Sequence, residues 1–399
     1  MPDRFSAELS ARYSKEFDEP GWLAERRADA CARFASLPWP DQSIEEWRHT
    51  DIRALDVDGF DPEVASPWGS DVPDGVVYGP LSQVARTHED LVRTWLGRAG
   101  VSEHDAKFHA LNAAFGIACI AYVPPGVTVQ EPLVTTRSIV TGGVIMPRTI
   151  IVVGEGASLT YIDRYEGGDA GEALAVPVVE IYAEQAAHVD YVSLQDWPQT
   201  VWHLGITRAL IGRDATVRQL TASLGGRLSR SVVQSVLDGS GAHAEMLGVY
   251  FGDHTQHIDN RTLQLHRARN TSSELYYKGA LKGSSRAVYS GLVDIEKDAH
   301  GSDAQQTNRN LLLSEHASAD PSPFLEIKTS EVVRATHAVS VGRPDENVLF
   351  YLHSRGLDAA SAERLLVTGF FQEIIDRVRV PQVRETLERA VEAELALEG

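Results

Sequence analysis

Histidines and cysteines are the side chains in this sequence that could bind a metal. The chain has 14 histidines but only 2 cysteines, Cys31 and Cys119, which lie far apart and form no CxxC pattern. A disulfide framework and a cysteine-ligated structural zinc site are therefore excluded. The histidines are the one class of residue whose positions suggest chemistry.

Two of the histidines, His254 and His257, have HxxH spacing and follow Asp253. They lie in a strand-like segment, where positions i and i+3 face opposite sides. Their imidazoles could converge on one ion only across a turn, so we expect structural or solvent-exposed roles. His266 and His300 stand alone in turn-like surroundings, and we expect both to be structural.

His337 is the more suggestive histidine, because it lies in SEVVRATHAVSVG, the last strand-like stretch before a helical tail. A neutral imidazole can ligate iron, and a histidine at the edge of a repetitive β fold is accessible to a partner's ligands. The alternative is a polar side chain that is hydrogen-bonded to a backbone carbonyl in a turn. Composition alone favours this alternative.

Motifs that mark several enzyme classes are absent from the sequence. No GxxxxGK[ST] loop occurs, so the chain has no P-loop ATP site of its own. No GxGxxG motif joins a strand to a helix, and no GxSxG elbow is present. The segment 154–156, Gly-Glu-Gly, is typical of a β-turn at a corner of the fold.

The acidic composition argues against several kinds of partner. The formal net charge is −19 and the sequence pI is about 5.2, so the surface repels nucleic acid and anionic membranes. The N-terminal segment MPDRFSAELSARYSKEF has no apolar signal-peptide core, and no run of about 18 apolar residues occurs. We therefore expect a cytoplasmic protein that neither contacts nucleic acid nor spans a membrane.

The residue pattern changes twice along the chain, which suggests three regions. Residues 1–115 indicate helices and loops, with helices predicted over Gly21–Leu37 and over 90–111. Residues 116–342 alternate short runs rich in Val, Ile, Leu, Thr and Tyr with turns rich in Gly, Asp, Asn and Ser, which is typical of closely spaced strands. Residues 343–399 become helical again.

In this tail, helices are predicted over 345–354, 359–378 and 383–397, and Gly356 ends the first of them. Asp345 is placed to cap that first helix. An uncovered end of a stacked β fold presents unpaired strand edges. The helical regions at either end of the chain can cover such edges, or can offer a surface to a partner.

A repeat of about 27 to 30 residues runs through the middle region, where a small residue follows each turn: Ala157, Ala187, Ala215 and Ala242. No helix separates the strands, so the repeat predicts a solenoid in which each turn adds one coil of chain. The alternative is a flat β-sandwich. We favour the solenoid because Asn-Gly hairpin turns are absent and many strands are apolar at successive positions.

Several motifs resemble the SufB/SufD family of the SUF iron–sulfur cluster assembly system. QQTNRNLLLSE at 305–315, PFLEI at 323–327, RATHAVSVG at 334–342 and LFYL followed by SRG at 349–356 match the family's signature. The segment EEWRHTD at 45–51 is typical of SufD and not of SufB. The resemblance covers nearly the whole chain and is closest to SufD.

This resemblance implies a right-handed parallel β-helix between helical N- and C-terminal regions, in a scaffold that is not an enzyme. It implies pairing of the β-helix with SufB, docking of the ATPase SufC on the C-terminal helices, and sulfur supplied by a cysteine desulfurase system. We expect the ATPase contact to involve Phe350, Tyr351, Arg355, Phe370 and Phe371. Homodimerisation of the isolated chain, the cluster type, the stoichiometry and the participation of flavin stay open.

The resemblance also makes His337 a candidate ligand of a transient iron–sulfur cluster formed at the SufB interface. Two departures from the family pattern lie beside it. Ala335 stands where many members have a cysteine, so the chain lacks the soft ligand expected of SufB. Ala338 replaces a glycine, and alanine resists positive φ.

Three rival interpretations stay in view. A SufB-like or homodimeric scaffold shares the same motifs. A β-helix polysaccharide lyase has a similar fold, although such enzymes are usually secreted. The third is a purely structural interaction protein that never contacts a cluster.

Overall fold

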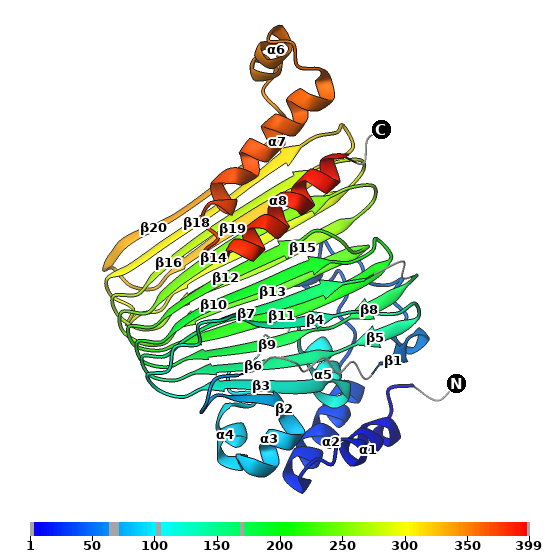
Figure 1. The fold of residues 1–399 in the computed structure, drawn as a ribbon, viewed down its shortest axis with the longest axis vertical. Coiled ribbons are helices and arrows are strands. Elements are labelled where there is room, and N and C mark those ends of the chain that lie inside the picture. Colours follow the sequence, from blue (N-terminus) through cyan, green and yellow to red (C-terminus); the bar gives the residue numbers. More distant parts are fainter. Residues whose placement is uncertain (1–3, 64–71, 101–104, 168–170, 397–399) are drawn as a thin grey trace.

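The computed structural model describes residues 4–63, 72–100, 105–167 and 171–396. Helices dominate up to Phe115, strands run from Ile117 to Gly342, and helices follow from Glu346. The strands wind into a β-solenoid of about eight turns, with helices at both ends of the chain (Figure 1). The predicted fold class is therefore confirmed.

Each turn of the solenoid adds one strand to each of two sheets, and every pairing between these strands is parallel. The parallel pairing rules out the β-sandwich alternative, which needs antiparallel hairpins. An antiparallel partner, β2 (Val77–Pro80), covers the start of sheet A. Sheet A contains β3 (Ile117–Val123), β6 (Pro147–Val153), β9 (Val178–Ala183), β11 (Val201–Ile211), β13 (Leu228–Leu237), β15 (His257–His266), β17 (Arg286–Ile295) and β19 (Ser318–Ile327), with β1 (Asp61–Pro62), β5 (Gly143–Ile145) and β8 (Ala173–Ala175) as a branch. Sheet B contains β4 (Leu133–Arg137), β7 (Ser158–Glu166), β10 (His188–Asp196), β12 (Thr216–Ser223), β14 (His243–Gly252), β16 (Ser272–Leu281), β18 (Ser302–Leu312) and β20 (Val332–Gly342).

The predicted repeat corresponds to one corner of the solenoid. Five successive coils place a residue in the left-handed region there, with φ of 55° to 76°: Gly156, Ala186, Asp214, Gly241 and Asn270. Each of these residues donates its N–H to a carbonyl of the next coil at 2.8–3.2 Å. The alanine that follows each of the first four is fully buried. A larger side chain would not fit where the stacked backbones approach so closely.

The N-terminal helices cover the end of the solenoid where the first coils lie (Figure 1). They are α1 (Ala7–Glu16), α2 (Gly21–Ser36), α3 (Leu81–Thr87), α4 (Glu89–Trp95) and α5 (Ala106–Phe115), with 3₁₀ turns at Glu45–Trp47 and Val57–Gly59. The prediction of a single helix over 90–111 is wrong, because α4 ends at Trp95 and the chain turns at Gly97 and Gly100. Both glycines have positive φ, which a continuing helix does not accommodate.

The EEWRHTD segment lies against the outer face of sheet A. Trp47 is buried beneath the guanidinium of Arg230, which lies 4.0 Å from the centre of the indole ring. Thr50 Oγ1 donates to Asp259 at 2.6 Å, and Arg230 forms ion pairs with both Asp259 and Asp105. This motif therefore fixes the N-terminal region to β13 and β15.

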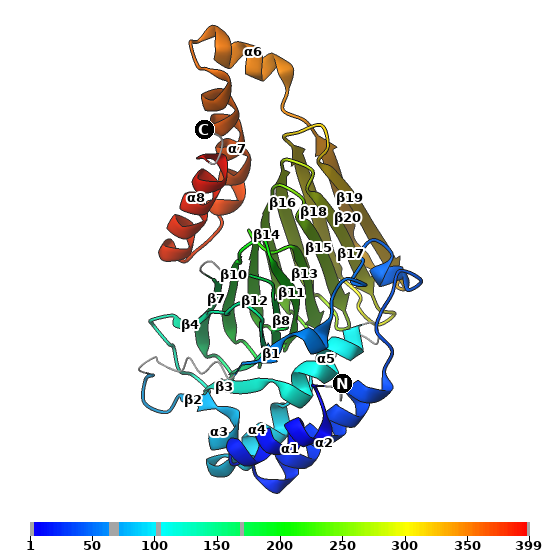
Figure 2. The same ribbon diagram turned by 90° about the vertical axis from the view of Figure 1, so that its right-hand side faces the viewer.

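The C-terminal helices are α6 (Glu346–Ser354), α7 (Ala359–Ile375) and α8 (Pro381–Ala396). α7 and α8 lie along the outer face of sheet B, whereas α6 extends beyond the sheets (Figures 1 and 2). Asp345 caps α6 as predicted, and Gly356 ends it with a φ of +91°. None of the helices in the described ranges combines the length and the hydrophobicity of a membrane span.

Candidate functional site at the open end of the solenoid

The last coil of the solenoid has an open side. β19 pairs only with β17, and β20 pairs only with β18, so among the described residues no strand continues either sheet. Large apolar side chains are exposed on this coil: Phe324, Ile327, Val333, Val339 and Val341. Folded proteins rarely leave such an apolar strand edge uncovered, so this end is a candidate interface.

His337 occupies the inward-facing side of β20. It is in register with Gln306 on β18, which is in register with Leu275 on β16 and then Met246 on β14. These three side chains are buried in the interior. Residues in register on parallel strands point the same way, so His337 continues this interior column and is exposed only because no further coil lies on it.

The inward-facing residues of the last coil form what we call the terminal layer. Its members are Ala319, Pro321, Pro323, Leu325 and Ile327 on β19, and Ala335, His337, Val339 and Val341 on β20. All of them are apolar except His337. An apolar layer of this kind resembles the core of a protein interface, which is more apolar than the surrounding rim.

The two free edges of the last coil differ in their backbone donors. The N–H groups of Ser318 and Lys328 bond back toward β17, so alternation along a parallel strand turns those of the odd-numbered β19 residues to the free edge. Pro321 and Pro323 occupy two of these positions and have no N–H. β20 contains no proline, and its edge keeps its donors.

Beneath the terminal layer lies a buried network of neutral polar groups. Gln306 Nε2 donates to Tyr289 Oη at 2.6 Å, and that hydroxyl lies 3.0 Å from Thr262 Oγ1. Burial raises the pKa of Tyr289 well above its usual range, so the phenol stays protonated. Gln306 Oε1 is buried and has no hydrogen-bond partner among the described residues. This acceptor belongs to the residue directly below His337.

The cysteines and the other histidines lie away from this end. Cys31 is buried in α2 and Cys119 in β3, and burial raises the pKa of both thiols. His266 is buried with its ring nitrogens at 2.7 Å from Thr271 Oγ1 and 2.8 Å from Ser273 Oγ, which confirms its structural role. No three His, Cys, Asp or Glu side chains in the described ranges group as a metal site.

His254 and His257 are separated by a turn. His254 is an exposed corner residue with a φ of +51°, and its ring lies against the carboxylate of Asp253. His257 begins β15 and is partly buried, and burial lowers the pKa of its imidazole. His300 is likewise partly exposed, with Nδ1 at 2.9 Å from Thr329 Oγ1.

The residues predicted to contact an ATPase fall into two groups. Phe350 and Tyr351 on α6 are exposed, at 74% and 54%, and Arg355 lies over the Tyr351 ring at 5.1 Å. Phe371 on α7 is fully buried against sheet B, and Phe370 is partly buried. The exposed group is open to a partner, whereas Phe371 holds α7 on the solenoid.

Comparison with known proteins gives two matching family descriptions. "SUF system FeS cluster assembly, SufBD core domain" matches residues 135–370, and "SufBD protein N-terminal region" matches residues 58–134. The core match includes the last coil of the solenoid and all of α6.

Curated relatives agree with these matches. An iron–sulfur cluster assembly SufBD family protein of Mycobacterium leprae (strain TN) is 36% identical over 370 residues, which cover 90% of this chain and 91% of the relative. One from Mycobacterium tuberculosis (strain H37Rv) is 38% identical over 387 residues, covering 94% of each chain. One from Staphylococcus saprophyticus is 29% identical over 304 residues, covering 75% of this chain and 64% of the relative. These names do not separate SufD from SufB, but the chain belongs to the SufBD family of the SUF system for iron–sulfur cluster assembly.

Proposed function

We propose that this chain is a SufD-like scaffold subunit of a SufBCD complex. In this role its open end pairs with SufB, its C-terminal helices dock the ATPase SufC, and His337 ligates a nascent iron–sulfur cluster. The cluster is the cargo of the complex, and the chain performs no catalysis of its own. The terminal layer, apolar except for His337, is the observation that carries the proposal.

The chemistry of this layer supports pairing with a second solenoid. Its exposed apolar side chains would continue the interior of both subunits once covered. The free edge of β20 keeps its N–H donors and can add a partner strand, whereas the two prolines block continuous pairing along β19. The partner strand is therefore expected along β20, next to His337.

An imidazole at this position suits a ligand role. Neighbouring strands lie about 4.8 Å apart, so the ring of His337 can turn one N–H toward the unpartnered Gln306 Oε1. That bond would hold one tautomer and direct the other ring nitrogen, with its lone pair, toward the partner. One imidazole supplies one ligand, so SufB would have to supply the rest.

The cysteine positions favour SufD over SufB. Ala335 lies in the terminal layer two residues before His337, where a thiolate would lie beside the imidazole in a SufB-type chain. The two thiols that the chain does have are buried elsewhere. A soft ligand for iron would therefore come from the other subunit.

The C-terminal helices suit transmission of an ATP-driven movement. α6 has no buried side chain, and it joins α7 through Gly356. The far half of α7 is fixed to sheet B, where Lys278 Nζ donates to the Phe370 carbonyl and to Glu373, both at 2.6 Å. Arg377 adds bonds of about 2.7 Å to Glu245 and Glu274. A force applied at α6 by closing SufC subunits would therefore reach the solenoid.

Co-purification from the native cell tests this assignment. The tagged chain is expected to bring a cysteine-bearing SufB and SufC with it in a defined complex. Purification of a homodimer with SufC but without any SufB would favour the homodimeric scaffold, and purification of neither partner would contradict the proposal. Membership of the SufBD family leaves the lyase alternative without support.

A further inference from the structure

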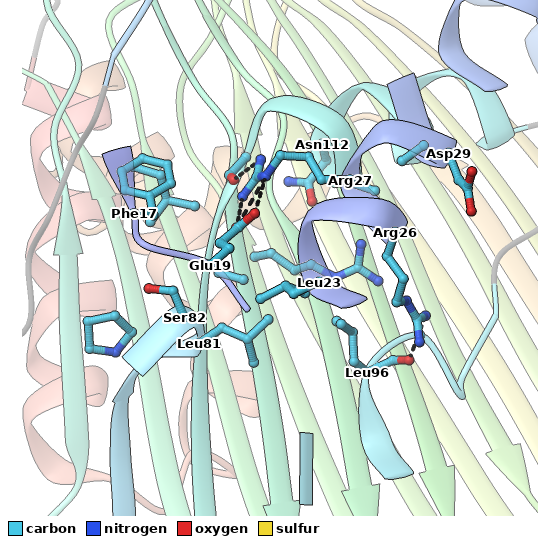
Figure 3. Close-up of a pocket in the computed structure, with 18 of the residues that line it drawn as sticks. Phe17, Glu19, Leu23, Arg26, Arg27, Asp29, Leu81, Ser82, Leu96 and Asn112 are labelled. Atoms are coloured by element: carbon cyan, nitrogen blue, oxygen red, sulfur yellow. Dashed lines mark hydrogen bonds and ion pairs between the residues drawn. The ribbon is translucent and has the colours of Figure 1, made fainter. Parts of the chain in front are cut away.

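A cavity of about 840 Å³ lies between the N-terminal helices and the first strands of the solenoid, far along the chain from the open end. α2 lines one side of it, α5 another, and the start of α3 a third (Figure 3). Phe17, Leu23, Leu81 and Leu96 give it an apolar wall. A cavity of this size holds a drug-sized organic molecule.

Most of the charged side chains around this cavity are already paired. Arg27 is buried and binds Glu19 at 2.6 Å, and it also donates to the carbonyls of Ala114 and Gly116. Arg148 forms a buried pair with Glu180. These pairs build the walls and leave little charge free for a ligand.

Arg26 and Arg33 are the exceptions among these cations, because neither pairs with a carboxylate among the described residues. Arg26 Nη2 donates to the Leu96 carbonyl at 3.0 Å. Arg26 and Arg148 both reach toward Gly97. A side-chain carbon placed on that glycine would lie 3.0 Å from Arg26 Nη2 and 3.9 Å from Arg148 Nη2, so the two guanidinium groups converge on one region of the cavity.

His109 lies in the same region. Its Nε2 is 3.3 Å from Arg148 Nη2, so the imidazole accepts from the guanidinium and is neutral. Burial and the nearby charges of Arg148 and Arg33 lower the pKa of His109 to about 3. The two charged groups that lower this pKa are both cations, although Arg148 also pairs with the Glu180 carboxylate, which accepts from the Gly97 N–H at 2.9 Å.

One buried polar atom beside the cavity also has no partner. Asn112, one turn after His109 on α5, lines the cavity and is 1% exposed. Its Nδ2 donates to the carbonyls of Pro147 and Val176, which fixes the orientation of the amide. Its Oδ1 is buried without a hydrogen-bond partner among the described residues. A buried acceptor left unpaired calls for a donor.

We infer that this cavity binds a small organic anion that has an apolar body, a phosphate or carboxylate group and a hydrogen-bond donor. Arg26, with Arg148 and His109 beside it, receives the anionic group. The leucine wall covers the apolar body, and Asn112 Oδ1 accepts from the donor. This inference does not rest on the scaffold role, because no residue of the terminal layer or of α6 takes part.

Titration calorimetry on the full chain tests the inference with matched probes. 1-Naphthyl phosphate and 1-naphthoate carry the apolar body with each kind of anionic group, 1-naphthol carries the body without the charge, and inorganic phosphate carries the charge without the body. We expect one of the two organic anions to bind at least about tenfold more tightly than 1-naphthol and inorganic phosphate. The preferred anion identifies phosphate or carboxylate as the natural group.

Two variants locate the binding. Arg26→Gln is expected to weaken the preferred anion at least about tenfold, and Ala113→Leu, which fills part of the cavity, is expected to weaken all organic probes. Arg12→Gln is the matched control, since Arg12 is an exposed arginine of α1 that does not line the cavity. Unchanged melting temperatures of the free variants exclude misfolding. The inference is overturned if neither organic anion binds below about 1 mM, or if Arg26→Gln binds the probes as the unsubstituted chain does.

Discussion

His337 is placed by the stacking of the coils, which turns its side chain toward the interior of the solenoid. Its inward direction depends on its register with Gln306, and that register shifts by one residue at Val333 just before it. Because side chains alternate along a strand, a shift of one residue reverses the direction of every side chain that follows. The sequence alone therefore identified the segment that contains His337, but not the column to which it belongs.

Glu394 on α8 is a residue whose protonation should affect stability. Burial, followed by the charges of Asp196 and Asp253, raises the pKa of this carboxyl to about 7, against the opposing effect of Lys282. The folded chain thus binds a proton more tightly than the unfolded chain, whose glutamate titrates near the usual 4.5. Stability should accordingly fall as pH rises from about 4.5 to 7.

Glu394→Gln removes this titration, and we expect the variant to melt at a higher temperature than the unsubstituted chain at pH 8. At pH 4.5 the two should melt at nearly the same temperature. Differential scanning calorimetry at both values measures the difference. Glu385→Gln, at an exposed position of the same helix, is the control. If the difference in melting temperature between Glu394→Gln and the unsubstituted chain were the same at pH 4.5 and at pH 8, Glu394 would not be protonated in the folded chain.

At the scale of elements, the repeat was predictable because each coil uses the same corner. The corner needs a residue in the left-handed region of φ followed by a small buried residue, and the small residue leaves a regular signal in the sequence. The prediction of one helix over 90–111 failed because isolated glycines do occur inside amphipathic helices, so Gly97 and Gly100 did not exclude a helix. The prolines of PFLEI and of the preceding Asp-Pro-Ser acquire a meaning only once β19 is known to be an edge strand.

α6 carries the first prediction at this scale. Phe350→Ser together with Tyr351→Ser should abolish binding of the ATPase SufC and leave SufB binding intact. Both rings are exposed, so their loss should change the free energy of unfolding by no more than about 0.5 kcal/mol. Pull-down with each partner separately measures the two contacts. Retention of SufC by the double variant would place the ATPase elsewhere.

Phe371→Ala provides the contrast on α7. Its ring is fully buried among residues of α7 and sheet B, so its loss should cost about 3–5 kcal/mol of stability. Chemical unfolding measures this cost. If Phe371→Ala lost SufC binding without losing stability, the ring would contact the ATPase directly, as the sequence resemblance predicted.

At the scale of the whole molecule, the two ends of the solenoid differ. The N-terminal helices cover the first coils, whereas the last coil exposes an apolar layer and a strand edge. A solenoid with one covered end and one open end can pair with a second solenoid only through the open end, which fits a scaffold that pairs end to end. The sequence predicted helical regions at both ends of the chain, but not which end of the solenoid they leave open, since that depends on how α7 and α8 turn back along sheet B.

Val339→Lys tests the pairing of the open ends. A lysine in the terminal layer would bury an unpaired charge in any interface formed there. The dissociation constant of the complex with SufB should therefore increase at least about a hundredfold. The isolated chain should also lose any self-association through this end. Light scattering coupled to size-exclusion chromatography measures both. Val134→Lys, on a partly exposed position of β4 in the first coils, is the control, and equal effects of the two lysines would contradict pairing through the last coil.

The most direct test of His337 as a cluster ligand is reconstitution of the cluster on the purified complex with SufB and SufC. Anaerobic addition of iron and sulfide, followed by the thiolate-to-iron absorbance bands, reports the cluster. We predict that His337→Ala retains both partners but forms no stable cluster, whereas Thr336→Ala, whose side chain faces away from the terminal layer, forms the cluster normally. If the His337→Ala complex assembled the cluster to the same yield and passed it on at the same rate, the ligand role of His337 would be contradicted.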